Sequence, residues 1–293
     1  MGAAPITQGR GHRIDEKQLA RYVHKRGLPL PPELRRPVLD RIGSQERGVL
    51  WWTGGLFLAG IVTALVVEWV TGNTNFSGIL ILLPPAFGVG VGSYLGLRRA
   101  RPHLVADAPR VARPKAMDVR DYTTRPEDLA VRLAAIVVAT AGLFTLLVWA
   151  LVPIKPGGGF WVPVILALVM GGVLGLLALF RKAETDLVER PQHAASELEL
   201  AWDDSTRADT IRALRDNSMV LALITVLGLM IVSGSWVIGP EARGAGPGLT
   251  MALGLAAFVV GCISWIILLV PWVVGRSRRN PALGLWSGKF GVA

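Results

Sequence analysis

Two polar segments of this sequence are rich in carboxylates, and carboxylate clusters are common ligands of Mg²⁺. One segment holds the candidate metal ligands Asp203, Asp204 and Asp209, and the other holds Asp118, Asp121, Glu127 and Asp128. If the fold brings both segments together, they could hold Mg²⁺ against a diphosphate, which would indicate a lipid-modifying enzyme. Runs of Asp, Ser and Thr are equally typical of helix starts. The sequence leaves both interpretations open.

Other reactive residue types are sparse. The single cysteine, Cys262, lies in an apolar run, which excludes a disulfide within the chain and a thiolate metal cluster. No HExxH, CxxC or Walker motif occurs. The four histidines lie in polar segments, at positions 12, 24, 103 and 193. We therefore identify no catalytic residue and no cofactor-binding residue, and we favour a protein that is not an enzyme.

The elements that would position these residues are apolar helices. The chain is 52% apolar with a mean hydropathy of +0.46, and about 20 apolar residues are needed for a helix to cross a bilayer. Runs of that length occupy residues 49–69, 77–97, 133–154, 160–180, 218–239 and 250–275. We predict an all-α integral membrane protein with six transmembrane helices arranged as three hairpins.

The charges between the runs predict orientation, because Lys and Arg near span ends stay in the cytoplasm. All but two of the 31 Lys and Arg, Lys155 and Arg243, fall in the two termini and the two long loops. We expect these four segments to be cytoplasmic, in a bacterial plasma membrane. The predicted organisation is a basic N-terminal segment with amphipathic helices (1–48), a first hairpin (49–97), a basic loop (98–132), a second hairpin (133–180), an acidic loop (181–217), a third hairpin (218–275) and a basic tail (276–293).

Short helices are expected within the cytoplasmic segments. Apolar spacing predicts one over 14–26 and another from about Pro32 to Ile42. Thr124 followed by Pro126 and Glu127 predicts the start of a helix that runs into the third span. A further helix is expected from Asp204 or Ser205 to Arg215, leading into the fifth span.

Basic residues beside the spans are expected to contact anionic lipid headgroups of the inner leaflet or a protein partner. No motif for nucleic-acid binding accompanies them. The residues are Arg21, Lys25, Arg98, Arg99, Arg101, Arg276, Arg278 and Arg279.

Glycines recur at four-residue spacing in two of the runs, which allows helix backbones to approach closely. They are Gly88, Gly92 and Gly96 in the second run and Gly171 and Gly175 in the fourth. The pattern indicates packing within the bundle, and a contact between copies of the chain is the alternative.

The interior of the spans carries no ionisable residue, which argues against coupled ion transport; Glu68 lies at a span end. Our leading hypothesis is a non-enzymatic membrane protein, an anchor or accessory subunit of an envelope, secretion or DNA-transfer assembly. The main alternative is the permease subunit of a transporter driven by a separate ATPase. A Mg²⁺-dependent lipid enzyme at the inner face is the third.

Overall fold

A computed structural model describes residues 19–20, 23–24, 28–71, 88, 91–92, 95, 117–151, 161–190, 194, 196–238, 247–277 and 286. Within these residues the chain is helical and contains no strand. The elements are α2 (Pro32–Thr71), the short 3₁₀ helix η2 (Val119–Asp121), α4 (Arg125–Leu151), α5 (Trp161–Glu189), α6 (Glu197–Ile238) and α7 (Pro247–Ser277).

Five of these helices contain a stretch long and apolar enough to cross a membrane, as expected of a multi-pass membrane protein. The stretches are Glu46–Val66, Arg125–Leu151, Pro163–Glu189, Glu197–Gly234 and Met251–Arg276. The second predicted span, 77–97, lies mostly outside the described residues, as does the predicted helix over 14–26. Whether 77–97 is a sixth span remains a prediction.

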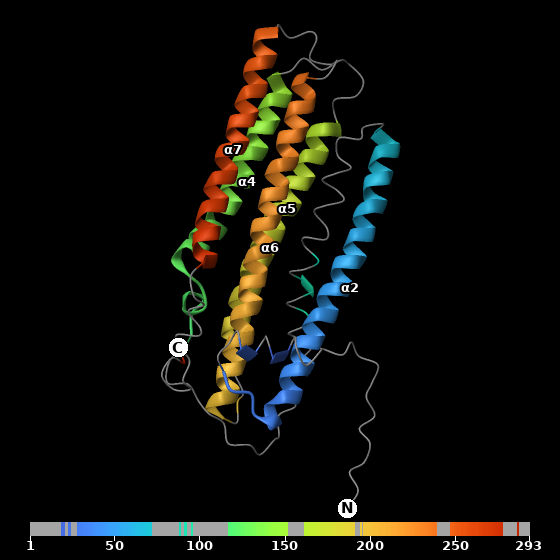
Figure 1. The fold of residues 1–293 in the computed structure, drawn as a ribbon. Coiled ribbons are helices and arrows are strands. Elements are labelled where there is room, and N and C mark those ends of the chain that lie inside the picture. The colour runs from blue at the N-terminus through green and yellow to red at the C-terminus, as the bar shows by residue number, and fades with distance from the viewer. Residues whose placement is uncertain are drawn as a thin grey trace, which may run out of the picture.

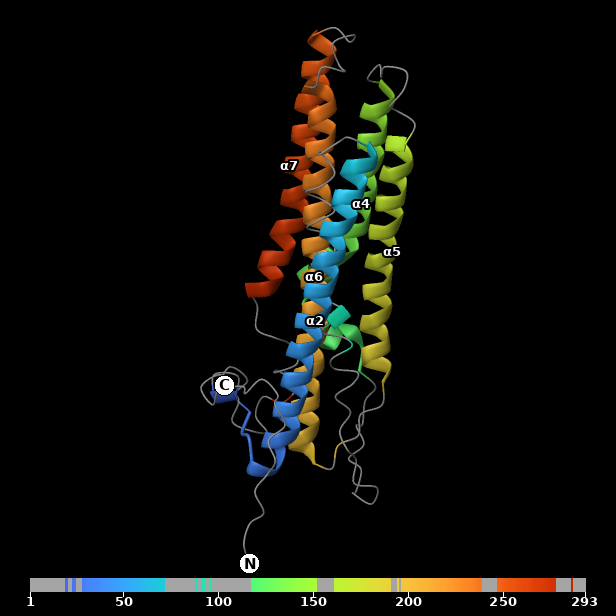
Figure 2. The same cartoon turned by 90° about the vertical axis from the view of Figure 1, so that its right-hand side faces the viewer.

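The helices α4, α5, α6 and α7 form a bundle, and α2 runs along its side (Figures 1 and 2). The buried core comes from all four bundle helices and includes Val138, Phe180, Ile211 and Leu268. The candidate span within α6 is the most buried of the five, with 67% of its apolar window inside the protein. It is therefore the central helix, and the outward faces of the others present large apolar side chains to the surroundings.

Two helices are much longer than a bilayer is thick. With 42 residues, α6 extends about 60 Å at the usual helical rise, and the 40 residues of α2 extend nearly as far. A hydrocarbon core is roughly 30 Å thick. Figures 1 and 2 show that the first halves of both helices continue beyond the ends of α4 and α7. The N-terminal half of α6 therefore lies at the polar end of the bundle.

Two predicted helix starts can be compared with the observed ones. The predicted start of α4 is confirmed: the Thr124 backbone N–H donates to Glu127 Oε2 at 2.8 Å, and the Glu127 N–H donates to Thr124 Oγ1 at 3.4 Å. The helix expected from Asp204 instead starts at Glu197, because the Ser196 hydroxyl accepts the Glu199 N–H and caps the helix there.

The first predicted span is not separate from the helix before it. The structure joins the short helix expected up to Ile42 and the run from residue 49 into the single helix α2. The intervening residues 43–48 include two glycines but no proline, and a lone glycine weakens a helix by only about 1 kcal/mol.

The glycines of the two stripes have different surroundings. A Cβ atom on Gly88 would lie 2.6 Å from Thr53 Cα, and one on Gly92 would lie 2.6 Å from Val49 Cα. Both glycines therefore lie directly against the backbone of α2, where only a hydrogen fits. A Cβ atom on Gly171 or Gly175 of α5 would have no neighbour within 4 Å in the described part of the chain. Gly96 lies outside the described residues.

Substituting Gly92 with Leu should therefore destabilise the protein by about 1–3 kcal/mol, the usual effect of overpacking. Thermal unfolding of the purified protein in mild detergent measures it. Gly171→Leu is the matched control, because its side chain would enter open space. Equal melting temperatures for the two variants would show that the contact with α2 does not constrain residue 92.

Candidate functional site

The polar half of α6 is the most unusual part of the molecule, because charged side chains are buried along it. Nine charged residues lie between Glu197 and Asp216. Among them Asp204, Arg207 and Arg215 are buried, with at most 6% of their surface exposed. A buried charge is unfavourable unless it is paired and hydrogen-bonded. The partners of these residues define two groups, one at the end of the bundle and one around the start of α6.

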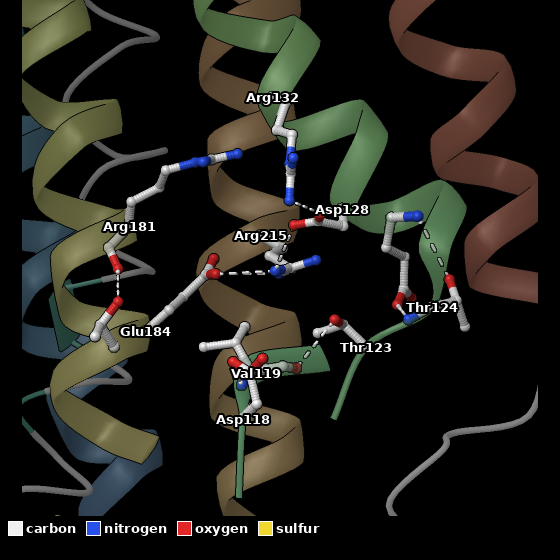
Figure 3. A network of polar contacts seen from close by, with 11 residues as sticks. Asp118, Val119, Thr123, Thr124, Asp128, Arg132, Arg181, Glu184 and Arg215 are labelled. Carbon is white, nitrogen blue, oxygen red and sulfur yellow. Dashed lines mark hydrogen bonds and ion pairs between the residues drawn. The ribbon is translucent and has the colours of Figure 1, made fainter. Parts of the chain in front are cut away.

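The first group, here called the charged layer, is centred on Arg215. Its Nε and Nη2 atoms donate to Glu184 Oε2 of α5 at 3.2 and 3.1 Å, and Nη2 also lies 3.4 Å from Asp128 Oδ1 of α4 (Figure 3). One guanidinium group thus joins three helices. Both partners of the Arg215–Glu184 pair have only 5% of their side-chain surface exposed.

Further pairs complete the layer on α4 and α6. The second oxygen of Asp128 lies 2.6 Å from Arg132 Nη2. Arg212 of α6 lies 3.6 Å from Glu127 Oε1, so the carboxylate that caps α4 also faces a cation. Acidic side chains at a helix N-terminus also interact favourably with the helix dipole.

The end of α7 joins the layer through Asp216 of α6. Asp216 accepts a hydrogen bond from Trp272 Nε1 at 3.0 Å and lies 2.8 Å from Arg276 Nη2. Gly275 lets α7 approach α4, because a Cβ atom there would lie 2.6 Å from Glu127 Cγ. The C-terminal end of α7 is therefore held against both α4 and α6.

The charged layer comprises the acids Glu127, Asp128, Glu184 and Asp216 and the arginines Arg132, Arg212, Arg215 and Arg276. Its charges balance, and it fixes the relative heights of four helices. Two buried atoms of the central pair, Glu184 Oε1 and Arg215 Nη1, have no hydrogen-bond partner among the residues that the structure describes.

The second group, here called the base, surrounds the start of α6. Asp204 is fully buried and accepts hydrogen bonds from Tyr122 Oη at 3.1 Å and from Trp286 Nε1 at 2.9 Å. On the neighbouring face, Trp202 Nε1 donates to the Pro29 carbonyl oxygen at 3.1 Å. Segments from three distant parts of the sequence therefore meet at α6.

Apolar side chains make the base a small core of its own. Its buried members are Leu28, Val38, Ala194, Leu200, Ala201, Trp202 and Trp286. Arg207 ties this core to α5, because its Nη1 atom donates at 2.9 Å to the carbonyl oxygens of Leu187 and Arg190 at the end of that helix. Carbonyls at a helix C-terminus lack partners within the helix, so a cation there is stabilising.

The structure does not gather the aspartates that the sequence suggested as metal ligands. Asp203 forms an ion pair with Arg207 at 3.0 Å, whereas Asp204 faces Tyr122 and Trp286, because consecutive residues point to different sides of a helix. Asp209 lies on a later turn of α6 than Asp203 and is only partly exposed. No group of three or more potential metal ligands occurs among the residues that the structure describes.

The acids of the other predicted segment also serve local structure. Asp118 and Asp121 form a reciprocal cap around η2, and Glu127 caps α4. Of the basic residues expected at headgroups or a partner, only Arg276 is described, and it pairs with Asp216. The others, Arg21, Lys25, Arg98, Arg99, Arg101, Arg278 and Arg279, lie outside the described residues.

Sequence reasoning missed Glu184, Arg215, Tyr122 and Trp286. The available signal for Arg215 was the position of a charged residue three residues before an apolar run, on the same stripe as Ile211 and Leu214. A charge on the apolar stripe of a helix indicates a buried partner on another helix.

Comparisons with protein-family models, with curated proteins and with solved structures found no match.

Truncating Arg215 to Met should destabilise the protein by roughly 3–5 kcal/mol, because Glu184 would be left as an unpaired buried charge. Converting both residues to Met should recover much of that stability, since an apolar pair needs no partner. Unfolding in mild detergent measures both variants. If the double variant is no more stable than Arg215→Met, then the pair is not the source of the effect.

Proposed function

We propose that this protein is a membrane anchor or accessory subunit of a bacterial envelope, secretion or DNA-transfer assembly, and that its base docks a protein partner. The base carries the proposal. Segments around Pro29, Tyr122, Trp202 and Trp286 form a folded unit beyond the N-terminal end of α4. A protein whose function lay entirely within the bilayer would need no such unit. We further propose that the base lies in the cytoplasm of a bacterial cell.

The proposed topology has six spans in three hairpins, with both termini cytoplasmic. Contacts support it, because Pro29 precedes α2 and Tyr122 precedes α4, yet both lie at the base. A chain that crosses once in α2 must return before Tyr122, and the apolar run 77–97 is long enough for that crossing. The excess of Lys and Arg in the same segments supports the cytoplasmic side.

Thiol labelling of intact cells tests this topology. In a background with Cys262 replaced by Ala, cysteines at Gly158 and Ala245 should react with an impermeant reagent added outside. A cysteine at Ser196, which is exposed beside the base, should react only after the membrane is permeabilised. Labelling of Ser196→Cys in intact cells would overturn the proposed orientation.

Crosslinking in cells of the native host, followed by purification and mass spectrometry, tests the docking function. We expect a stoichiometric envelope, secretion or DNA-transfer component. Asp204→Ala should remove it by opening the base, because Tyr122 and Trp286 lose their shared acceptor. The exposed acid Asp186 offers the matched control, and Asp186→Ala should retain the partner.

The outcomes separate the competing hypotheses. Recovery of an ATPase in place of such a component would favour the permease subunit. A protein that purifies without any partner would overturn the docking function. Loss of a Mg²⁺-dependent lipid activity in an Asp203→Asn variant whose fold is intact would favour the lipid enzyme.

A further inference from the structure

Two arginines lie on the membrane side of the central Arg215–Glu184 pair, Arg132 within the charged layer and Arg181 outside it. Arg132 lies four residues after Asp128 on α4, and Arg181 lies three residues before Glu184 on α5. In an antiparallel helix pair, these steps lead in the same direction, about one turn from the layer toward the apolar parts of both helices. Figure 3 shows both side chains reaching into the space between α4 and α5, in front of α6.

The charges around this space do not balance. Asp128 and Glu184 are the two acids, and Arg215 and Arg132 already pair with them. Arg181 is exposed, and within the described part of the chain its guanidinium group forms no hydrogen bond or ion pair. The five side chains together therefore carry one net positive charge.

The surroundings are those of a lipid headgroup. Ile136, one turn beyond Arg132 on the same face of α4, is 61% exposed, and Ala178, one turn before Arg181 on α5, is exposed as well, so both face the acyl chains of a bilayer. An arginine next to hydrocarbon is stabilised when its head reaches a polar group at the membrane surface. Arginine also binds phosphate oxygens through paired N–H donors.

We propose that Arg132 and Arg181 bind the phosphate of one anionic phospholipid in the leaflet at the base end of the bundle. The phosphodiester supplies the missing negative charge, and the acyl chains lie along the exposed apolar faces of α4 and α5. A zwitterionic phospholipid fits less well, because its headgroup brings a second cation beside the arginines. This binding does not depend on the proposed docking of a protein partner.

Titration of the detergent-purified protein with short-chain phosphatidylglycerol tests the proposal, with thermal unfolding and native mass spectrometry as readouts. We expect a rise in melting temperature and a stoichiometric bound lipid. The double variant Arg132→Gln with Arg181→Gln should weaken binding roughly tenfold or more, because two charge-assisted contacts are lost. The neighbouring exposed cation offers a matched control: Lys182→Gln should bind as the wild type does.

Three results would overturn the proposal. Equal stabilisation by phosphatidylcholine of the same chain length would show that apolar contact alone is responsible. Equal stabilisation by inorganic phosphate would show a site for free phosphate. Equal weakening by Lys182→Gln would show diffuse attraction to the surface.

A single variant separates weaker lipid binding from loss of the fold. Arg181→Gln removes none of the ion pairs described for the charged layer, so its melting temperature without lipid should equal that of the wild type. Its affinity for phosphatidylglycerol should still fall. Unchanged affinity in this variant would also contradict the proposal.

Discussion

The burial of Arg215 on the central helix is the constraint on which the arrangement of the bundle depends. A guanidinium group removed from water must find carboxylates, and α6 has none in reach on its own buried face, so the partners come from α4 and α5. Each partner helix must reach the level of Arg215 as a helix. This explains why α5 continues nine residues beyond Phe180 and why α4 begins one turn before Asp128. The register of three helices is therefore set by one side chain.

The same helix, α6, also fixes the position of the base relative to the charged layer. Between Glu197 and Leu227, α6 contains neither proline nor glycine, the two residues that most weaken a helix. The acceptor that organises the base, Asp204, and the cation that organises the charged layer, Arg215, are eleven residues apart on this uninterrupted helix. The base is thus held at a defined distance, about 16 Å along the axis, from the end of the bundle.

The two halves of α6 satisfy their polar groups in different ways. In the apolar half, the hydroxyls of Ser218, Thr225 and Ser233 donate to carbonyl oxygens four residues earlier in the same helix. A hydroxyl bonded in this way needs no partner elsewhere and suits an environment without water. In the polar half, Arg215 has no carboxylate partner on its own helix, so it binds acids of α4 and α5. The polar contacts that fix α6 relative to its neighbours are therefore concentrated in its charged half.

Sequence alone determined the apolar helices and the start of α4. Hydrocarbon thickness sets the length of a span, and the cap formed by Thr124 and Glu127 is local, so both can be predicted without knowing the neighbours. Only the tertiary structure decided the pairing of Arg215 with Glu184 and the role of Asp204 as a hydrogen-bond acceptor. These contacts join residues 31 and 82 positions apart. They depend on which helices are neighbours and at what height, which no local pattern of residues encodes.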